Sequence, residues 1–509
     1  MCGFLFYYSS QLSETKSLKK LFKTIKWRGP DNTGYFESEK IFMAHNRLKI
    51  VGKNDLSNQP MFSSNNRFII LYNGEIYNHL NLRKKINRYF YTNSDTETLL
   101  ALYEIYGKKM LEMIEGMFAF VIYDRKQDKI FIARDRFGIK PLFYYQKKNK
   151  IIFSSEVSLI NSVVRSKIDR QSIKEWKIIR RPLPGKTFFR NIHEVLPANY
   201  SIINLKNNTI QTSEYWSLKK KSKKFSQKKF EKQLKEIVND YEMNDYNNTS
   251  LISGGIDSGI IAALSKVREL YTIGMKHNNE FDIAKYNSKI LKKKLVKITV
   301  TKSQLKKAWV SLIKKKGEPL YVPNEGLLYL MCKRMKKNQK VVLTGEGADE
   351  LLFGYSDLFK KVYYCKNFSI SFFLKEYSYS KNISISPRLK KYLNNLYKQK
   401  NKIIFFEDFF YKIHLSVLLR RMDFSTMAAS KEARVPFLNH RLVEMFYRAP
   451  LKVKTDLKLF KIPLLKVFKN FKLQSFPNKI AFSARNKEHN DKYSEYNEFT
   501  KINLKTLEW

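Results

Sequence analysis

The stretch LISGGIDS, residues 251–258, constrains the fold of this chain more than any other. The apolar run at 249–252 predicts the end of a buried strand, and the apolar pattern at 258–264 predicts the start of a helix. Glycines at such a corner let the backbone approach a ligand closely, and the free N–H groups at the helix start attract anionic oxygens. The stretch therefore predicts a phosphate-binding turn for ATP. An ordinary strand–turn–helix corner is the alternative that the glycines alone leave open.

A second loop, GEGADE at residues 345–350, places three carboxylates within five residues. Such a cluster repels itself unless a cation or a catalytic role holds it, and Mg²⁺ prefers one or two carboxylates together with substrate phosphates. A calcium loop would need the longer D-x-[DN]-x-[DN]-G spacing, which the sequence lacks. The glycine turn also lacks the lysine of G-x-x-x-x-G-K-[ST], so a kinase or GTPase loop is not expected.

Strand-like and helix-like patterns alternate around these two loops. We expect strands at 270–275 and 340–344, and helices at 258–264, 282–295 and 325–335. That order predicts a parallel α/β sheet, whose ligands bind at the carboxyl ends of the strands. Both candidate loops leave the sheet at that edge.

Composition bounds the remaining classes. With 509 residues the chain is long enough for two or more domains. Its net charge of +50 would suggest nucleic acid, but the lysines occur in nearly every segment, which indicates a bias in residue usage rather than a binding groove. The seven histidines show no zinc-binding spacing.

Cysteine usage and hydropathy predict the location of the protein. Three cysteines are too few for a disulfide framework and fit a reducing compartment, so we expect a cytoplasmic protein. No apolar stretch reaches the ~18 residues of a membrane span, and the opening MCGFLFYY lacks the basic leader of a signal peptide. We therefore expect no membrane partner.

Cys2, followed by Gly3, becomes the first residue if Met1 is removed. One residue then carries a thiol and a free α-amine with a pKa near ~8, and the amine can act as the base for its own thiol. This is the arrangement of an N-terminal nucleophile. A cysteine placed here by chance is the alternative.

A strong β run at 68–72 stops at Asn73, Gly74 and Glu75. At a strand end, an asparagine side chain and a glycine N–H can together donate two hydrogen bonds to a developing oxyanion. A hairpin turn at Asn73–Gly74 is the alternative, because Asn-Gly favours such turns.

Two charged residues of the first half suggest substrate contacts. Arg47 lies on a strand expected at 44–50, and its planar fork can bind a carboxylate. Ser94 and Glu97 have capping-box spacing before an apolar helical run, which places Asp95 at a helix mouth, free to take an ammonium group. Without further support, each charge could equally be a solvated surface residue.

Ordered motifs across the first half carry a resemblance to a known family. They are MCG, RGPD, HNRLKI, YNGEIYN, SDTE, EGMFAF and RDRFGIKPL. The first half thereby resembles the glutaminase domain of the glutamine-hydrolysing asparagine synthetase family. The resemblance implies a four-layer αββα fold of the N-terminal-nucleophile type, with Cys2 attacking the side-chain amide of glutamine. It also implies the glutamine-binding residues, which are Arg47, Ile50, Val51, Asn73, Gly74, Glu75 and Asp95, with Asn73 and Gly74 as the oxyanion hole.

The second half resembles the synthetase domain of the same family. The motifs are SGGIDS, GEP at 317–319, LTGEGADELLFGY, and RMDFSTMAASKEARVPFLNHRL at 421–442. The resemblance implies that a carboxylate attacks the α-phosphorus of ATP with release of pyrophosphate, and that ammonia converts the acyl adenylate to an amide. Glu346 is implied as the base for ammonia. Lys461, in KIPLLK, is implied as the cation that stabilises the adenylate, unless it is simply one of the many lysines.

The same resemblance assigns the nucleotide. Leu251 and Ile273 frame the adenine, and Asp257 and Asp349 ligate magnesium. The implied ATP-binding set is Leu251, Ser253, Gly254, Gly255, Asp257, Ser258, Ile273, Thr344 and Gly345.

Several positions depart from the family pattern. Gly259 replaces a usual serine, Asn439 replaces the aspartate of PFLDH, and Leu465 replaces the arginine of K-x-x-L-R. GEP stands for the usual DEP, and Thr344 for a common serine. None of these removes the phosphate turn or the carboxylate cluster, but they leave the acceptor carboxylate open.

We therefore expect a glutaminase domain at 2–216, a lysine-rich linker at 217–235, and a synthetase domain at 236–509 that ends in a helical part. The expected enzyme is a glutamine-dependent asparagine synthetase, a carbon–nitrogen ligase that uses ATP and magnesium and channels ammonia to aspartate. One alternative is the same chemistry on another carboxylate, such as a sugar acid or a peptide. The other is a basic nucleic-acid-binding protein on an inactive scaffold, which would bind RNA in a salt-dependent way. The sequence leaves open whether the chain forms a homodimer.

Overall fold

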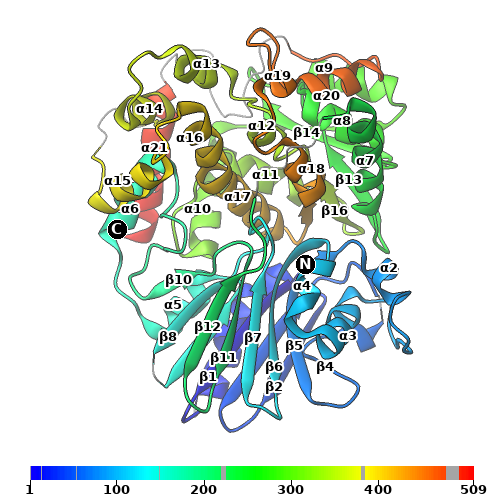
Figure 1. Cartoon of the computed structure of the whole chain (residues 1–509), viewed down its shortest axis with the longest axis vertical. Helices are drawn as coiled ribbons and strands as arrows, with labels where there is room; N and C mark the ends of the chain where they lie inside the picture. Colours follow the sequence, from blue (N-terminus) through cyan, green and yellow to red (C-terminus); the bar gives the residue numbers. More distant parts are fainter. Residues whose placement is uncertain are drawn as a thin grey trace.

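The structure is a computed structural model that describes residues 2–12, 14–52, 54–147, 149–218, 225–379, 384–476 and 492–509. In Figure 1, strands β1 to β12 form the lower part of the molecule and the elements from α7 onward form the upper part. The expected linker at 217–235 lies partly outside the described residues.

The first half contains, within the residues described, two six-stranded antiparallel sheets. Their strand orders are β10-β8-β9-β1-β3-β2 and β12-β11-β7-β6-β5-β4. The strands are β1 (Cys2–Ser9), β2 (Asn32–Glu37), β3 (Ile41–Arg47), β4 (Met61–Phe62), β5 (Phe68–Ile76), β6 (Gly116–Asp124), β7 (Lys129–Arg134), β8 (Phe143–Lys147), β9 (Lys150–Ser154), β10 (Ile192–Glu194), β11 (Asn199–Asn204) and β12 (Thr209–Glu214).

Side chains along each strand point alternately to the two faces of its sheet, and this alternation gives the half four layers. Phe4 and Phe6 of β1 pack between the sheets with Ile69 and Leu71 of β5. Leu5 and the other alternate side chains of β1 face helices instead. The first sheet is covered by α1 (Thr15–Phe22) and α5 (Val157–Val164), and the second by α3 (Asp95–Tyr106), with α2 (His79–Arg83) and α4 (Met110–Met113) beside α3. Helix α6 (Arg170–Ile179) packs instead with the helical part of the second half. This confirms the αββα fold.

The second half contains a five-stranded parallel sheet, counted over the described residues, in the order β15-β14-β13-β16-β17. This confirms the predicted parallel α/β sheet. Its strands are β13 (Asn247–Leu251), β14 (Glu269–Met275), β15 (Lys294–Val300), β16 (Gln339–Leu343) and β17 (Glu432–Arg434). Helix α7 (Gln227–Asp240) precedes β13, and α8 (Ile256–Leu264), α9 (Phe281–Ile290), α10 (Lys302–Lys316) and α11 (Glu325–Lys333) connect β13 to β16.

One element of this sheet was predicted wrongly. The helix expected at 282–295 ends at Ile290, and β15 begins at Lys294. The strand lies at the sheet edge, paired only with β14, and exposes Lys294 and Lys297. The two lysines lie on opposite faces of the strand, so β15 lacks the continuous apolar run that marks a central strand of a parallel sheet.

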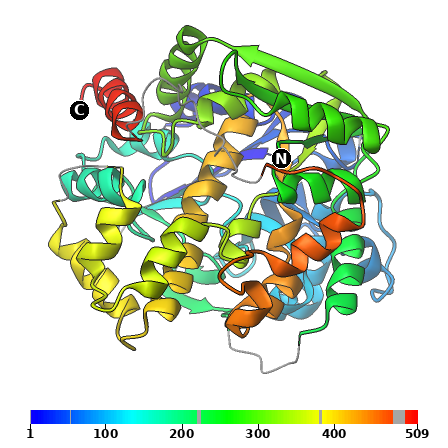
Figure 2. The ribbon, with the colours of Figure 1, turned by 90° about the horizontal axis from the view of Figure 1, so that it is seen from above.

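The helical C-terminal part lies over the sheet and to one side of it (Figure 2). Its helices are α12 (Ala348–Leu351), α13 (Ser356–Tyr364), α14 (Ile370–Tyr377), α15 (Pro387–Leu396), α16 (Lys402–Phe409), α17 (Leu415–Met427), α18 (His440–Phe446), α19 (Leu451–Lys454), α20 (Ile462–Lys469) and α21 (Lys492–Leu507). Phenylalanines of α13, α14 and α16 form an aromatic core of their own. Helix α17 continues from a π-helical turn at Phe410–His414 and packs against α11 and β17.

The boundary between the halves falls near α7. Residues 227–235 of the expected linker are helical, Ser226 caps the helix by accepting from the Lys229 amide, and Phe230 and Leu234 are buried. These side chains pack with the second half. We propose that α7 belongs to the second domain.

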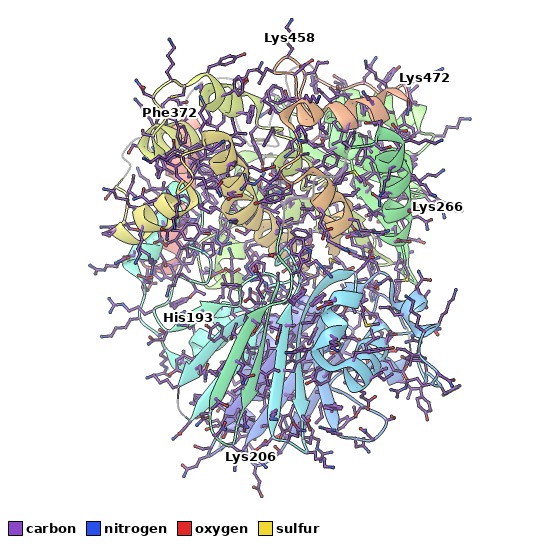
Figure 3. All side chains as sticks on the ribbon, in the orientation of Figure 1. His193, Lys206, Lys266, Phe372, Lys458 and Lys472 are labelled. Carbon is purple, nitrogen blue, oxygen red and sulfur yellow. The ribbon has the colours of Figure 1, made fainter. Side chains whose placement is uncertain are left out.

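Lysine side chains lie on several sides of the molecular surface (Figure 3). Lys206, Lys266, Lys458 and Lys472 point outward on different sides of the molecule (Figure 3). Within the described chain, no helix combines the length and apolar character needed to cross a membrane.

Candidate active sites

Cys2 lies buried at the start of β1, where the two sheets meet. Its backbone N–H donates to Asn73 Oδ1 at 3.0 Å. This bond fixes the amide of Asn73, so its Nδ2 faces away from the Cys2 backbone; Nδ2 is buried and has no hydrogen-bond partner among the described residues. A buried, unpaired N–H donor beside a cysteine is the arrangement that an oxyanion hole requires.

The expected end of this strand was wrong, and the alternative of a hairpin turn is not seen either. Strand β5 does not stop at Asn73 but continues through Gly74 and Glu75 to Ile76, and no hairpin turn forms. Gly74 pairs with Phe118 of β6, and a Cβ at Gly74 would lie 2.8 Å from the Phe118 Cα. Glycine is needed here because the neighbouring backbone approaches too closely for a side chain.

The Cys2 thiol has an unusual environment. Burial acts to raise its pKa, but the charge of His45, the positive charge of the chain's N-terminus, and hydrogen bonds from His45 and the Leu48 N–H outweigh it and lower the pKa to about 6. His45 Nε2 lies 3.0 Å from the Tyr72 carbonyl, which can only accept, so Nε2 carries a proton and is held by that carbonyl. A thiolate near neutral pH is the nucleophilic form of cysteine. Sequence reasoning missed His45, although it lies in the HNRLKI motif.

Arg47 is close to Cys2, since the two residues pair across β1 and β3. Its guanidinium, however, donates to the carbonyls of Val51, Gly52 and Asn54 and to Asn58 Oδ1. The arginine therefore organises the loop at 51–58, which follows Ile50. Arg47 thus lies beside Cys2, but its guanidinium is already hydrogen-bonded to this loop.

Asp95 begins α3, as predicted. Its Oδ2 accepts from the Tyr72 hydroxyl at 2.6 Å and from the Ile76 amide at 3.0 Å. Ser94 caps the helix through the Thr96 amide. The reciprocal half of the capping box is not formed, because Glu97 accepts from the Thr92 amide at 2.8 Å instead.

Glu75 reaches across the boundary between the halves. Its Oε2 accepts from Arg434 Nη2 at 2.9 Å, and its Oε1 is buried with no partner in the described part of the chain. Arg434 ends β17, is fully buried, and also binds Glu432 Oε1 at 2.6 Å. Sequence reasoning missed Arg434, because nothing local marks a partner 359 residues away.

A second buried cluster joins Cys2 to the other half. Arg28 donates to the Cys2 carbonyl at 3.0 Å, to Glu156 Oε1 at 2.5 Å, and to Asp423 Oδ2 at 2.9 Å. Arg28 is 0 % exposed, and Asp423 belongs to α17 of the second half. The RGPD and RMD motifs contain these residues, but their contact follows from the tertiary fold alone.

The strand-to-helix turn of SGGIDS forms where it was predicted. Strand β13 ends at Leu251 and α8 begins at Ile256. Ser253 and Ser258 hold the turn: the Ser253 amide donates to Ser258 Oγ at 3.1 Å, and the Gly255 amide donates to Ser253 Oγ at 3.2 Å. Ile273 lies in the adjacent strand β14, next to the expected adenine position at Leu251.

One backbone N–H of the turn is hydrogen-bonded to a residue outside the turn. The Gly254 amide donates to Glu280 Oε2 at 3.0 Å, and the Gly254 carbonyl accepts from the Phe476 amide at 3.0 Å. A carboxylate therefore occupies an N–H that an anionic phosphate would need.

The two candidate loops meet at Lys461. Its Nζ donates to Asp257 Oδ2 at 2.6 Å and forms an ion pair with Asp349. A Cβ at Gly345 would lie 2.9 Å from the Asp257 Cβ, so the GEGADE loop packs directly on the SGGIDS turn. Two carboxylates that converge on one cation fit magnesium held together with substrate phosphates. Among the described residues no group of three or more His, Cys, Asp or Glu side chains is placed to hold a metal by itself.

The remaining acids of the second loop have different partners. Glu346 forms an ion pair with Arg421 of α17, and its amide contacts Thr344 Oγ1 at 3.4 Å. Glu350 is buried and accepts from the Tyr355 hydroxyl. Burial, together with the neighbouring acids Asp349 and Glu346, raises the pKa of Glu350 to about 8.

Several departures from the family pattern have local structural causes. A Cβ at Gly259 would lie 2.8 Å from the ring of Phe468, so a helix packs where the usual serine would be. Asn439 caps α18 by accepting from the Arg441 amide at 2.9 Å. Gly317 ends α10 with a φ of 64°, a left-handed conformation that glycine adopts freely.

Comparison with known proteins covers both halves. The family model described as "Glutamine amidotransferase domain" matches residues 1–216, and the model described as "Asparagine synthase" matches residues 229–505. The chain is 30% identical over 377 residues to "Asparagine synthetase [glutamine-hydrolyzing] 1" of Bacillus subtilis, covering 70% of this chain and 59% of that protein. It is 31% identical to "Asparagine synthetase [glutamine-hydrolyzing] 2" of the same organism, covering 67% of this chain and 49% of that protein. A third protein of that organism, "Asparagine synthetase [glutamine-hydrolyzing] 3", is 25% identical, covering 89% and 82%. The matches thus span about half to three fifths of the length of the first two relatives.

Proposed function

This chain belongs to the glutamine-hydrolysing asparagine synthetase family, and we propose that it makes asparagine from aspartate with ATP and ammonia taken from glutamine. The observation that carries the proposal is the meeting of Lys461 with Asp257 and Asp349 at the glycine turn. This acid–lysine cluster gives the chain a place for ATP phosphates in addition to the buried cysteine of the first half.

In the first half, we propose that the Cys2 thiolate attacks the side-chain amide carbon of glutamine. Asn73 Nδ2, unpaired among the described residues, donates to the oxyanion together with the Gly74 N–H. Collapse of this intermediate, as its nitrogen takes up the proton that the Cys2 thiol lost, releases ammonia and leaves a thioester on Cys2, which water hydrolyses to glutamate. Asp95 binds the ammonium group of glutamine, and Arg47 binds its carboxylate in place of a carbonyl of the 51–58 loop.

In the second half, an acceptor carboxylate attacks the α-phosphorus of ATP, and pyrophosphate leaves. The turn from Ser253 to Ser258 holds the phosphates once its N–H groups exchange the side-chain oxygens that they bind in the free protein for phosphate oxygens. Lys461 balances the charge on the leaving group. Asp257 and Asp349 would hold magnesium, which neutralises phosphate charge when it is bound.

Ammonia then attacks the carbonyl carbon of the acyl adenylate. Glu346 takes the proton that the nitrogen loses, and AMP leaves with the electrons of the broken C–O bond. We propose that ammonia reaches this point inside the protein, because free ammonia would mostly take up a proton in bulk water at neutral pH. The buried clusters around Arg28 and Arg434 lie along the interface that such a path must cross.

Two variants test the two halves separately. Cys2→Ala should abolish release of glutamate from glutamine but leave pyrophosphate release driven by ammonium salts. Asp349→Ala should stop pyrophosphate release with either nitrogen source while glutamate release continues. If Cys2→Ala also loses synthesis from ammonium, the two sites are not separate and the proposal fails.

A second candidate keeps this chemistry and changes the acceptor to a sugar acid or a peptide carboxylate. It is favoured by the low identity of the relatives, 25% to 31%, over the part of the chain that they match. Pyrophosphate release measured with a panel of acids separates the two candidates. Absence of release with every acid, together with tight salt-dependent RNA binding, would instead favour a nucleic-acid-binding role.

We also propose a cytoplasmic location. Cys2, Cys332 and Cys365 are all unpaired, which suits a reducing compartment. Fractionation of the source cells tests this proposal.

A further inference from the structure

The two halves of the chain enclose a cavity that lies outside both candidate sites. Its volume is about 360 Å³, and small-molecule sites begin near ~300 Å³. Helices α2 and α4 of the lower part of the molecule border it, together with α7 and α18 of the upper part (Figure 1). None of the described residues that line it belongs to the cysteine site or to the acid–lysine cluster.

Charges of both signs face this cavity. Arg441 and Lys85 supply two cations, and Glu115 and Asp240 supply two anions. Arg441 Nε lies 3.3 Å from Glu115 Oε2, and Arg441 Nη2 lies 3.8 Å from Asp240 Oδ2. Both distances exceed the usual N–H···O range of about 2.7–3.2 Å, and Nε is buried without a hydrogen-bond partner among the described residues. The guanidinium therefore keeps donors available for a ligand.

The acids of the cavity lack full compensation. Burial raises the pKa of Asp240, and the negative charges of Glu115 and Glu236 raise it further against the opposite effect of Arg441. A carboxyl group whose pKa is raised is stabilised by an additional positive charge nearby. An ammonium group placed between Glu115 and Asp240 would supply that charge.

The loop that carries Glu115 is held in place from both ends. Asn78 Nδ2 donates to the Met113 carbonyl at 2.9 Å, and Asn78 Oδ1 accepts from the Glu115 amide at 2.9 Å. The Tyr77 amide donates to the Glu115 carbonyl at 2.8 Å. Polar groups on a backbone fixed in this way hold their positions for recognition.

Part of the cavity wall is apolar. Leu82 is buried, and Met113 lines the same side. The ring of Tyr77 is stacked on that of Tyr241, with centroids 3.7 Å apart. The Tyr77 hydroxyl is buried and has no hydrogen-bond partner in the described part of the chain. A ligand that fits this wall carries an apolar group beside its charges.

One departure from the family pattern lines this cavity. Asn439, which replaces the aspartate of PFLDH, is 5 % exposed and accepts from the Arg441 amide. An aspartate at this position would add a third anion to the cavity and would repel a ligand carboxylate. With asparagine, two cations face two anions. This balance suits a ligand that carries one charge of each sign.

We propose that this cavity binds a free α-amino acid with an apolar side chain, separately from the glutamine and ATP sites. The carboxylate of the ligand binds Arg441 and Lys85. Its ammonium group lies between Glu115 and Asp240, and its side chain packs against Leu82. A peptide end carries one of these two charges, whereas a free amino acid carries both on the same carbon.

A ligand in this cavity touches both halves of the chain. The Arg434 guanidinium lies 5.5 Å from the centroid of the Tyr77 ring and binds Glu75, two residues before Tyr77. The cavity thus adjoins the buried charges of the interface. Because a ligand that binds only the folded chain stabilises it by mass action, occupancy should raise the unfolding midpoint Tm.

The test is direct binding to the full chain, measured by titration calorimetry without ATP. The probes are leucine, methionine and phenylalanine, and at least one should bind with a Kd at or below ~1 mM and raise Tm. The amide of that amino acid lacks the carboxylate, and its N-acetyl derivative lacks the ammonium group. Both derivatives should bind roughly 10- to 100-fold more weakly, the value of one charge-assisted contact.

Two variants assign the binding to this cavity. Arg441→Met should weaken binding of the amino acid roughly 10- to 100-fold and change binding of its amide much less. Asn439→Asp should also weaken it, through the added anion, while aspartate still caps α18. Lys361→Met, which removes a surface cation paired with Glu376, is the matched control and should bind as wild type. An unchanged unfolding transition without ligand shows that each variant is folded.

Three results would overturn the inference. The first is the absence of saturable binding by all three amino acids below ~10 mM. The second is equal affinity for an amino acid and its amide. The third is binding that Arg441→Met leaves unchanged, since another surface would then be responsible. Binding needs no turnover, so failure of glutamate or pyrophosphate release would overturn the proposed function and leave this inference standing.

Discussion

Replacing Arg434 with methionine tests how far the glutamine site depends on the other half of the chain. The guanidinium is fully buried and binds Glu75 Oε2 at 2.9 Å, Glu432 Oε1 at 2.6 Å, and the carbonyls of Tyr241 and Met243 at 2.9 and 2.7 Å. Methionine has a similar length and no donors. The variant therefore removes the charge while filling most of the space.

The magnitude follows from the burial of both partners. Removing one member of a buried ion pair costs about 3–5 kcal/mol, because the other charge is left uncompensated. Glu75 is 3 % exposed and follows Gly74, so its carboxylate must turn away or take up a proton. If glutamine thereby loses one charge-assisted hydrogen bond of about 1.5–3 kcal/mol, kcat/KM for its hydrolysis falls roughly 10- to 100-fold.

The assay is glutamate release, with pyrophosphate release from ammonium as the internal reference. Arg434→Met should lower the first by the stated factor and change the second much less. The double variant Arg434→Met, Glu75→Gln should resemble Glu75→Gln alone, because no charge of that pair remains unbalanced. Arg434→Lys should recover part of the loss. An equal fall in both activities, or single effects that simply multiply in the double variant, would refute the reasoning.

Four further predictions concern single groups. Asn73→Ala should lower kcat for glutamine hydrolysis by roughly 10²- to 10³-fold, as loss of an oxyanion donor does, and an unchanged kcat would exclude that role. Glutamate release should rise with pH through about 6 and then level off, because the Cys2 thiol is ionised above its lowered pKa; a midpoint near ~8.5, the ordinary thiol value, would contradict this. Lys461→Met should stop pyrophosphate release yet leave glutamate release intact, and pyrophosphate release at the wild-type rate would count against it. Glu280→Gln should lower KM for ATP by about 5-fold, since roughly 1 kcal/mol of repulsion at the Gly254 amide is removed, and a raised KM would argue that the carboxylate helps to bind ATP.

Local chemistry made parts of both halves predictable. The glycine turn of SGGIDS combines a strand end, a helix start and small residues within eight positions, so its conformation is set by near neighbours. The same holds for Asp95, which a serine cap places at the start of α3. The parallel sheet was also predictable, because buried strands such as β16 are apolar on both faces.

The features that escaped prediction depend on distant contacts. Arg434 and Asp423 are ordinary charged residues by sequence, and their importance comes from partners 359 and 395 residues away. Gly74 was placed just after the end of a strand, because the apolar β run stops at Tyr72, yet close packing against β6 keeps it inside β5. The edge strand β15 was missed because half of its side chains face solvent. Each error arose where tertiary contact overrode a local preference.

The interface between the halves contains buried charged side chains, although burying apolar side chains there would cost less free energy. A buried ion pair is often no more stabilising than well-packed hydrophobic residues, so stability alone does not account for Arg28, Asp423 and Arg434. Hydrogen-bonded ion pairs are directional, and these reach the Cys2 carbonyl and the residue after the Gly74 of the proposed oxyanion hole. We infer that they fix the register of one half against the other, which a transfer of ammonia between two sites requires.

Helix α17 ties this register to the GEGADE loop. Arg420 and Asp423 are three residues apart and so share a face of the helix, which meets the first half. Arg421 is turned about 100° from Arg420 around the helix axis and meets Glu346. A rotation of α17 that improved either set of contacts would break the other. The helix therefore holds Glu346, the proposed base for ammonia, at a fixed orientation to the point where ammonia is released, and a variant that loosens one contact of α17 must be assayed at both sites.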